Sequence, residues 1–221
     1  MRLLLLSRLR EASADPDVHV IVVAGAGRAF CVGQNLGSLS ELNNAYETVA
    51  RTYNPLIAAI MEAPKPVIAA VNGPAAGAGM GLALACDIVI MSDNAYYSCA
   101  FGKVGLVPDS GTTAFLVRSL GRHLAFEVAT TGRRIAAAEA LKLGIASSVV
   151  AGEAFDEHIE ATLARLCGEP SGTLALTKEL IRTAVDASSE EMLRMEAVCQ
   201  GLAASAATHT ERRTAFLTKT K

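Results

Sequence analysis

Two segments rich in small residues are the places where the main chain itself could do chemistry. They are residues 30–36 (FCVGQNL) and residues 74–81 (PAAGAGMG). Small residues let a ligand approach the main chain closely, and a free N–H at the start of a helix carries the positive end of the helix dipole. Two such N–H groups directed at one carbonyl oxygen would stabilise the negative charge that forms when the neighbouring carbon loses a proton.

These glycines have other interpretations. Either segment, taken alone, is typical of a tight turn that serves only the fold. A dinucleotide-binding fingerprint is a further alternative, because Gly77 and Gly79 follow a predicted strand, but the third glycine would fall at Leu82. Residues 25–27 (GAG) also follow a predicted strand, and there the third position is Phe30. No phosphate-binding GK[ST] motif is present, so nucleotide binding has little support.

Composition excludes several classes of protein. The 221 residues suit a single domain, and a net charge of −2 with scattered Lys and Arg favours neither nucleic acid nor an anionic membrane as a partner. The five cysteines show no metal-binding spacing, which is typical of reduced thiols, so we expect a cytoplasmic protein. Residues 66–86 carry no charge, but their glycines and Pro74 argue against a membrane span.

The elements that would position the two segments alternate between helix and strand. Helices are predicted over residues 1–14, 42–63, 80–86 and 112–121, and short strands over residues 19–24, 67–71 and 88–91. The chain after residue 121 is expected to be mainly helical, with one extended piece near residues 147–150. The first helix is expected to be amphipathic through Leu3, Leu6 and Leu9. Alternation at this spacing predicts an α/β fold with a parallel sheet. We divide the chain into an α/β core, residues 1–152, and a C-terminal helical region, residues 153–221.

Several motifs, in their order along the chain, resemble those of the enoyl-CoA hydratase/isomerase (crotonase) superfamily. They are residues 19–36 (HVIVVAGAGRAFCVGQNL), 65–74 (KPVIAAVNGP), 86–88 (CDI), 105–109 (GLVPD) and 140–146 (ALKLGIA). The resemblance covers essentially the whole chain. It implies a spiral of ββα turns with C-terminal helices that assemble trimers, commonly paired into hexamers, and an acyl-coenzyme A thioester as substrate.

The resemblance also implies roles for individual residues. The backbone N–H groups of Gln34 and Ala78 would form an oxyanion hole for the thioester oxygen. The residues that would contact the substrate or its coenzyme A are Val32, Gly33, Asn35, Leu36, Gly77, Gly81, Phe101, Phe216 and Lys219. Coenzyme A belongs to the substrate, and no metal or other cofactor is implied.

This chain departs from the family pattern at three places. The two glutamates with which hydratases position water correspond here to Gly81 and Phe101, and neither residue can act as an acid or a base. The aspartate that usually ends the first loop is replaced by Asn35, which loses the charge. The given chain starts at the family's first helix, so we expect the basic contact from the family's N-terminal hairpin to be missing.

Asp109 is then the carboxylate best placed to act. Its segment resembles the loop that carries the aspartate of ring-epoxide (epoxyphenylacetyl-CoA) and dienoyl-CoA isomerases. One carboxylate can take a proton from one carbon and return it to another, which is all that moving a double bond requires, and an apolar pocket would raise its pKa. The alternative is that Asp109 only caps the helix that follows. Gly81 is expected to leave space beside the thioester for a bulky or cyclic acyl group.

Three hypotheses about function follow. The leading one is an acyl-CoA thioester isomerase that acts through Asp109. The others are an enoyl-CoA hydratase-type lyase with non-standard acid groups and a catalytically silent subunit that binds coenzyme A thioesters. Of the remaining polar side chains, His123 and Glu127 are interpreted as surface residues and Cys31 as a small filler.

Overall fold

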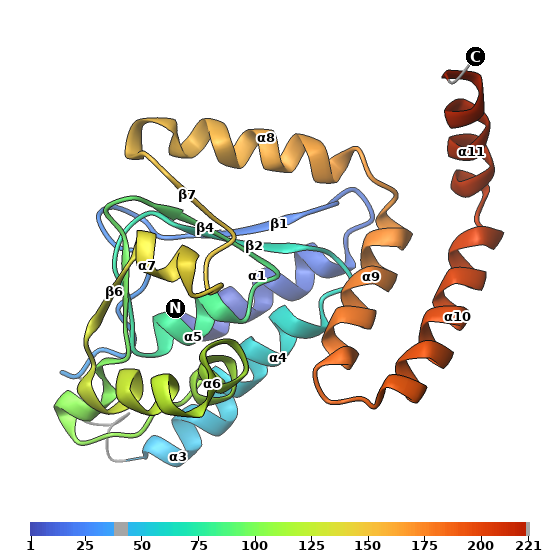
Figure 1. Ribbon diagram of the computed structural model, residues 1–221. Helices are drawn as coiled ribbons and strands as arrows, with labels where there is room; N and C mark the ends of the chain where they lie inside the picture. The colour runs from blue at the N-terminus through green and yellow to red at the C-terminus, as the bar shows by residue number, and fades with distance from the viewer. Residues whose placement is uncertain (38–43, 220–221) are drawn as a thin grey trace.

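The computed structural model describes residues 1–37 and 44–219, and its centre is a parallel sheet of four strands (Figure 1). The strand order is β1 (Ile21–Ala24), β2 (Val67–Val71), β4 (Ile88–Ser92) and β7 (Ser148–Val150). Every neighbouring pair in this sheet is parallel. The predicted α/β class and the three predicted strands are therefore confirmed, and the extended piece predicted near residues 147–150 is the fourth strand.

Helices cover both faces of the sheet, which is why its strands are continuous apolar runs. On one face, Val67, Ala69 and Val71 pack in the main core with α1 (Arg2–Ala14) and α4 (Asn54–Glu62). On the other face, Ile68 and Ile90 pack against α8 (Phe155–Cys167). The first helix of the predicted C-terminal region thus lies on the sheet, and the division at residue 152 stays a prediction.

The sequence did not predict a second, smaller sheet. It consists of β3 (Ala75–Ala76), β5 (Tyr96–Ser98) and β6 (Arg134–Ala136). Strand β5 pairs with β3 in parallel and with β6 in the antiparallel sense. This sheet holds the short 3-10 helix η2 (Ala100–Val104), which follows β5, next to the second glycine loop.

The long helix predicted over residues 42–63 contains a π-helical turn. From residue 44 onward it is described as α3 (Ala45–Thr48), the π-helical turn η1 (Val49–Tyr53) and α4. The backbone N–H of Asn54 bonds to the carbonyl of Val49, five residues back, and Pro55 has no N–H to donate. A proline in the middle of the pattern therefore accounts for the widened turn.

The helix predicted to end at Gly121 does so: Gly121 has a φ of 72° and a non-helical backbone, and a second helical segment follows this kink within α6 (Thr112–Thr131). One other helix prediction needs correction. In α1, Leu6 and Leu9 are buried as expected, but Leu3 is 62% exposed, so the predicted apolar face is wrong at that residue. The remaining core helices are α5 (Ala78–Leu84), α7 (Ala137–Lys142) and η3 (Gly152–Ala154).

The rest of the chain is helical, as predicted. It forms α9 (Ser171–Ala184), α10 (Ser189–Ser205) and α11 (Ala207–Lys219), of which α11 lies far from the sheet (Figure 1). One partly buried ion pair connects α9 to the core: Lys178 Nζ lies 2.7 Å from Asp87 Oδ2. The same ammonium group donates to the carbonyl of Ile60 at 2.8 Å. Within residues 1–37 and 44–219, none of the helices is both long and apolar enough to span a membrane.

Candidate functional site

One cavity of about 270 Å³ brings together residues from four segments of the chain. Eight of the residues singled out from the sequence line it: Val32, Gly33, Gln34, Leu36, Gly77, Ala78, Phe101 and Asp109. The other lining residues are Tyr53, Ala100, Lys103, Val104 and Leu106. Both glycine loops and the Asp109 loop therefore meet at one place.

The two glycine loops lie side by side because their backbones pair. Cys31 forms a parallel bridge with Ala75, and the N–H of Ala76 donates to the carbonyl of Cys31 at 2.8 Å. Gly33 has a φ of 88°, and a Cβ added there would lie 3.4 Å from the Ala78 nitrogen. The amide of Ala78 thus stands directly beside the first loop.

The second loop presents an amide at the start of a helix. Gly77, with a φ of 54°, precedes α5, whose first residue is Ala78, two residues earlier than predicted. Among the described residues, neither the backbone N–H of Gln34 nor that of Ala78 has a hydrogen-bond acceptor. Both N–H groups are therefore available to a ligand oxygen, and both belong to residues that line the cavity.

Gly81 does not line this cavity, and the expected free space beside it is absent. A Cβ at residue 81 would lie 2.6 Å from the carbonyl oxygen of Ser110 and 2.6 Å from Thr112 Oγ1. The turn that precedes α6 therefore packs directly on Gly81. The expectation that this glycine makes room for a bulky acyl group is wrong, because the neighbouring turn already occupies the room.

Asp109 is half-buried and lines the cavity. Ser110 Oγ donates to Asp109 Oδ1 at 2.8 Å. Burial raises the pKa of Asp109, and the hydrogen bond from Ser110 opposes that rise. The N-cap of α6 is Gly111, and no side chain caps that helix, so the alternative that Asp109 is a helix cap is wrong.

Backbone conformation at residues 110 and 111 aims the aspartate. Ser110 has a φ of 53°, the one positive value among described residues other than glycine, and Gly111 follows with a φ of 74°. Two successive left-handed residues reverse the chain sharply. The N–H of Thr112 donates to the carbonyl of Asp109 at 2.9 Å, which closes the turn.

Besides Gly81, two residues implied by the resemblance, Asn35 and Phe216, do not line the cavity. Asn35 accepts a hydrogen bond from the N–H of Gly37 at 3.0 Å and shapes its own loop. Phe216 is 72% exposed on α11, which packs next to α10 and lies far from this site (Figure 1). Lys219 ends α11, and its side chain lies outside the described part of the chain. A single chain therefore does not bring Phe216 to the cavity.

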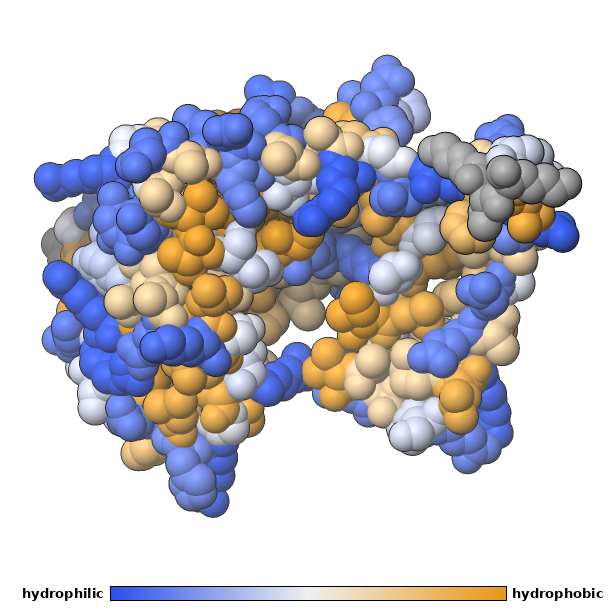
Figure 2. All heavy atoms as spheres, turned by 45° about the horizontal axis from the view of Figure 1, so that its top comes forward, coloured by the Kyte–Doolittle hydropathy of each residue, from blue (hydrophilic) through white to orange (hydrophobic). Residues whose placement is uncertain are grey.

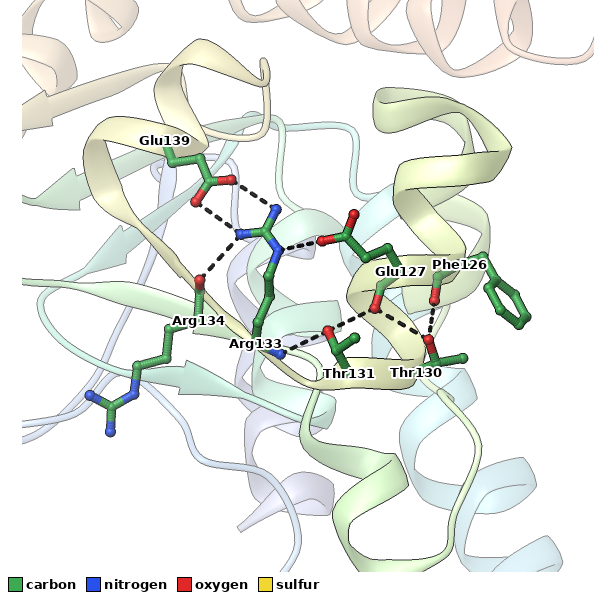
Figure 3. A network of polar contacts seen from close by, with 7 residues as sticks. All are labelled: Phe126, Glu127, Thr130, Thr131, Arg133, Arg134 and Glu139. Carbon is green, nitrogen blue, oxygen red and sulfur yellow. Dashed lines mark hydrogen bonds and ion pairs between the residues drawn. The ribbon is translucent and has the colours of Figure 1, made fainter.

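Glu127 does not line the cavity and belongs to a separate network of polar contacts (Figure 3). Arg133 Nε donates to Glu127 Oε1 at 2.9 Å, and Arg133 Nη2 lies 2.9 Å from Glu139 Oε1. Ser98 Oγ donates to the carbonyl of Gly132 at 3.0 Å, next to this network. The network joins α6 to β6 and α7 and supports the segment that leads into η2. Glu127 is a surface residue in this network, as interpreted; His123 is likewise exposed.

Tyr53 lines the cavity although no motif in the sequence singles it out. This tyrosine is only 6% exposed and lines the cavity from the π-helical turn. The one signal in the sequence is Pro55, two residues further on, because a proline inside a helical pattern predicts a local distortion and π-turns are frequent at functional sites.

Comparison with known proteins gives consistent matches over nearly the whole chain. Residues 4–221 match the family model described as enoyl-CoA hydratase/isomerase. A Rhodobacter capsulatus protein named probable enoyl-CoA hydratase is 40% identical over 93% of this chain and 80% of its own length. The 1,2-epoxyphenylacetyl-CoA isomerase of Escherichia coli is 37% identical over 96% of this chain and 82% of its own length. The crystal structure of an enoyl-CoA hydratase from Polaromonas sp. JS666 superimposes with a TM-score of 0.93 at 34% identity, covering 99% of this chain and 87% of that one.

Proposed function

Because this chain belongs to the enoyl-CoA hydratase/isomerase family, we propose that it shifts a double bond in an acyl-CoA thioester through an enolate. The observation that carries the proposal is the cavity itself: it joins two unpaired main-chain amides, at Gln34 and Ala78, with the carboxylate of Asp109. An enoyl group or a ring-derived acyl group would fit this chemistry.

The proposed reaction on a 3-enoyl thioester uses one proton. The Asp109 carboxylate removes a proton from carbon 2, and the electron pair spreads over the thioester oxygen and carbon 4. The N–H groups of Gln34 and Ala78 stabilise the negative oxygen, and a single such donor is typically worth about 2.7–4 kcal/mol. Protonated Asp109 then returns the proton to carbon 4, which leaves a conjugated 2-enoyl thioester. No metal or redox cofactor takes part in this scheme.

Burial suits Asp109 to both halves of this reaction. A carboxyl group whose pKa is raised toward the working pH is a better base than an ordinary exposed aspartate and still gives the proton back readily. The lining also includes apolar side chains, such as Val32, Phe101 and Leu106, against which the acyl chain would pack.

A hydratase is the second candidate, and the name of the Rhodobacter capsulatus relative favours it. Against it stand the residues at the family's two glutamate positions. Phe101 lines the cavity without an acidic group, and Gly81 is covered by the Ser110 turn. Adding water would require a relocated acid. The third hypothesis, a silent thioester-binding subunit, remains as an outcome of the same experiment.

The test is turnover of trans-3-hexenoyl-CoA and, separately, of trans-2-hexenoyl-CoA in deuterated, oxygen-labelled water. Isomerisation of the 3-enoyl thioester produces a conjugated thioester without labelled oxygen, in which carbon 4 carries the proton from carbon 2, or deuterium if protonated Asp109 exchanges with the solvent first. Incorporation of the labelled oxygen would establish hydration, and tight binding without any turnover of this or other enoyl thioesters would establish a silent subunit.

We also propose that the chain self-associates as a homotrimer or as a dimer of trimers. Large apolar side chains are exposed along the C-terminal helices, which lie on the right in Figure 2: Ile181, Val185, Leu193, Val198, Leu202, Phe216 and Leu217. Exposed apolar patches of this kind are typical of protein interfaces. Association would allow Phe216 and Lys219 to reach the coenzyme A site of a neighbouring copy. Sedimentation at micromolar concentration tests the assembly.

A further inference from the structure

Three polar side chains of the cavity lining have no part in the proposed proton transfer: those of Tyr53, Gln34 and Lys103. Lys103 is exposed to solvent, whereas Tyr53 and the amide nitrogen of Gln34 are buried. Most of the remaining lining is apolar or glycine, including Val32, Leu36 and Val104. Since buried polar groups in proteins are almost always hydrogen-bonded, each of the two buried groups needs a partner.

The hydroxyl group of Tyr53 accepts one hydrogen bond but donates none to the described residues. Arg2 Nη1 donates to Tyr53 Oη at 3.2 Å, and the Arg2 guanidinium carbon lies 4.6 Å from the centre of the ring. The phenol oxygen is therefore already an acceptor, and it donates to none of the described residues. What remains on this oxygen is a single O–H donor in a residue that lines the cavity.

The hydroxyl stays protonated in this setting. Burial raises the pKa of Tyr53; the Arg2 guanidinium opposes this, and the negative charge of Asp109 adds to the rise. Tyr53 is consequently a neutral donor that shares the cavity with a carboxylate. It cannot serve as a base near neutral pH, so its role is to bind.

Gln34 supplies a second unpaired donor. Its Nε2 atom is buried, and in the described part of the chain it has no hydrogen-bond partner. The other buried side-chain atoms in this situation belong to Asn72, Tyr97 and Thr112, which do not line the cavity. Both unpaired donors therefore belong to residues that line the cavity, and a hydrocarbon chain bound there would satisfy neither of them.

We propose that the acyl group of the substrate carries an acceptor oxygen, such as an ether, epoxide or carbonyl oxygen, to which Tyr53 Oη and Gln34 Nε2 donate. This inference rests on the proposed function, because the thioester must occupy the cavity with its own carbonyl at the two main-chain amides. It narrows the substrate class from enoyl thioesters in general to oxygenated ones.

The experiment compares non-reactive thioesters by calorimetry. Heptanoyl-CoA is set against three analogues of equal length in which an ether oxygen replaces the CH₂ at carbon 4, 5 or 6. At least one ether should bind about threefold to tenfold more tightly than heptanoyl-CoA, which is the gain typical of a neutral hydrogen bond. Tyr53→Phe, which keeps the ring over Arg2, should reduce that preference to near unity.

Matched variants separate a specific loss from a general one. Tyr97→Phe removes another buried phenol oxygen, outside the cavity, and should keep the full ether preference. Gln34→Met keeps the backbone N–H and the chain length but removes the side-chain donor, and should weaken the preference in part.

If no ether binds better than heptanoyl-CoA, or if Tyr53→Phe keeps the preference, the inference is overturned, and a water molecule satisfies the two donors instead. Turnover of trans-3-heptenoyl-CoA is followed in parallel, because isomerisation without an ether preference leaves the proposed function standing. Failure to bind any of the thioesters removes both.

Discussion

The side of helix α5 that borders the cavity and the side that is covered by the turn before α6 differ, and Asp109 marks the first whereas Gly81 marks the second. Asp109 lines the cavity next to Ala78, whereas Gly81, one turn further along α5, is covered by the carbonyl of Ser110. Consecutive residues of one turn therefore do two jobs: one points a carboxylate into the cavity and the next closes the helix surface. The positive φ of Ser110 makes this reversal possible. An acid–base group can therefore reach the substrate only from the cavity side of α5, which we call the open side; the side at Gly81 is the closed side.

The largest effect is expected from removing the carboxylate on the open side. Asp109→Asn keeps the shape of the side chain but cannot accept a proton, and general acid–base groups contribute about 10²–10⁴-fold to the rate. Isomerisation of trans-3-hexenoyl-CoA should fall by that factor, whereas binding of heptanoyl-CoA should change little. Asp156→Asn, an exposed site on α8, is the control. Full turnover by Asp109→Asn would refute the assignment.

The second-largest effect is expected on stability, from a substitution at Gly81 on the closed side of α5. Gly81→Ala adds a Cβ that would lie 2.6 Å from backbone and side-chain atoms of the turn, so it should lower the free energy of unfolding by about 1–3 kcal/mol. Urea unfolding measures this. Gly172→Ala is the matched control, because its Cβ meets no atom within 4 Å among the described residues and a helical alanine is favoured over glycine. Equal stability of both variants would show that position 81 is open after all.

Some of these elements could be predicted from the sequence and others could not. The strands of the main sheet were predictable because both their faces are buried, which makes them apolar throughout, as in β2. Strands β3, β5 and β6 are only two or three residues long, too short for a periodic signal. The Asp109 loop was found through its resemblance to known isomerases. Tyr53 was not predicted as a site residue, because the helical pattern does not reveal which residue a π-turn directs into a cavity.

Asp109 should also make stability depend on pH. Its folded-state pKa is raised, so the folded chain holds this proton more tightly than the unfolded chain does. That contribution to stability is fully present below the ordinary value of 3.8 and is lost as the pH rises through the folded-state pKa. Relative to the wild type, Asp109→Asn should therefore gain stability above this window and gain none below it. Thermal unfolding across the pH range shows the difference, and a constant offset would contradict it.

The smallest effect is expected at Ser110. Ser110→Ala removes the hydroxyl that donates to Asp109 and that opposes the rise of its pKa. The pKa of Asp109 should rise further, so the acidic limb of the rate profile should move to higher pH with little change in the maximal rate. Ser205→Ala, on the distant α10, should leave the profile in place. An unmoved profile in Ser110→Ala would mean that another group sets that limb.

The most direct test of the account is a crystal structure of the chain with heptanoyl-CoA bound. We predict that the thioester oxygen lies within about 2.7–3.1 Å of the backbone nitrogens of both Gln34 and Ala78, with carbon 2 facing Asp109. A thioester bound elsewhere, or an oxygen that meets only one of the two amides, would contradict the proposed site.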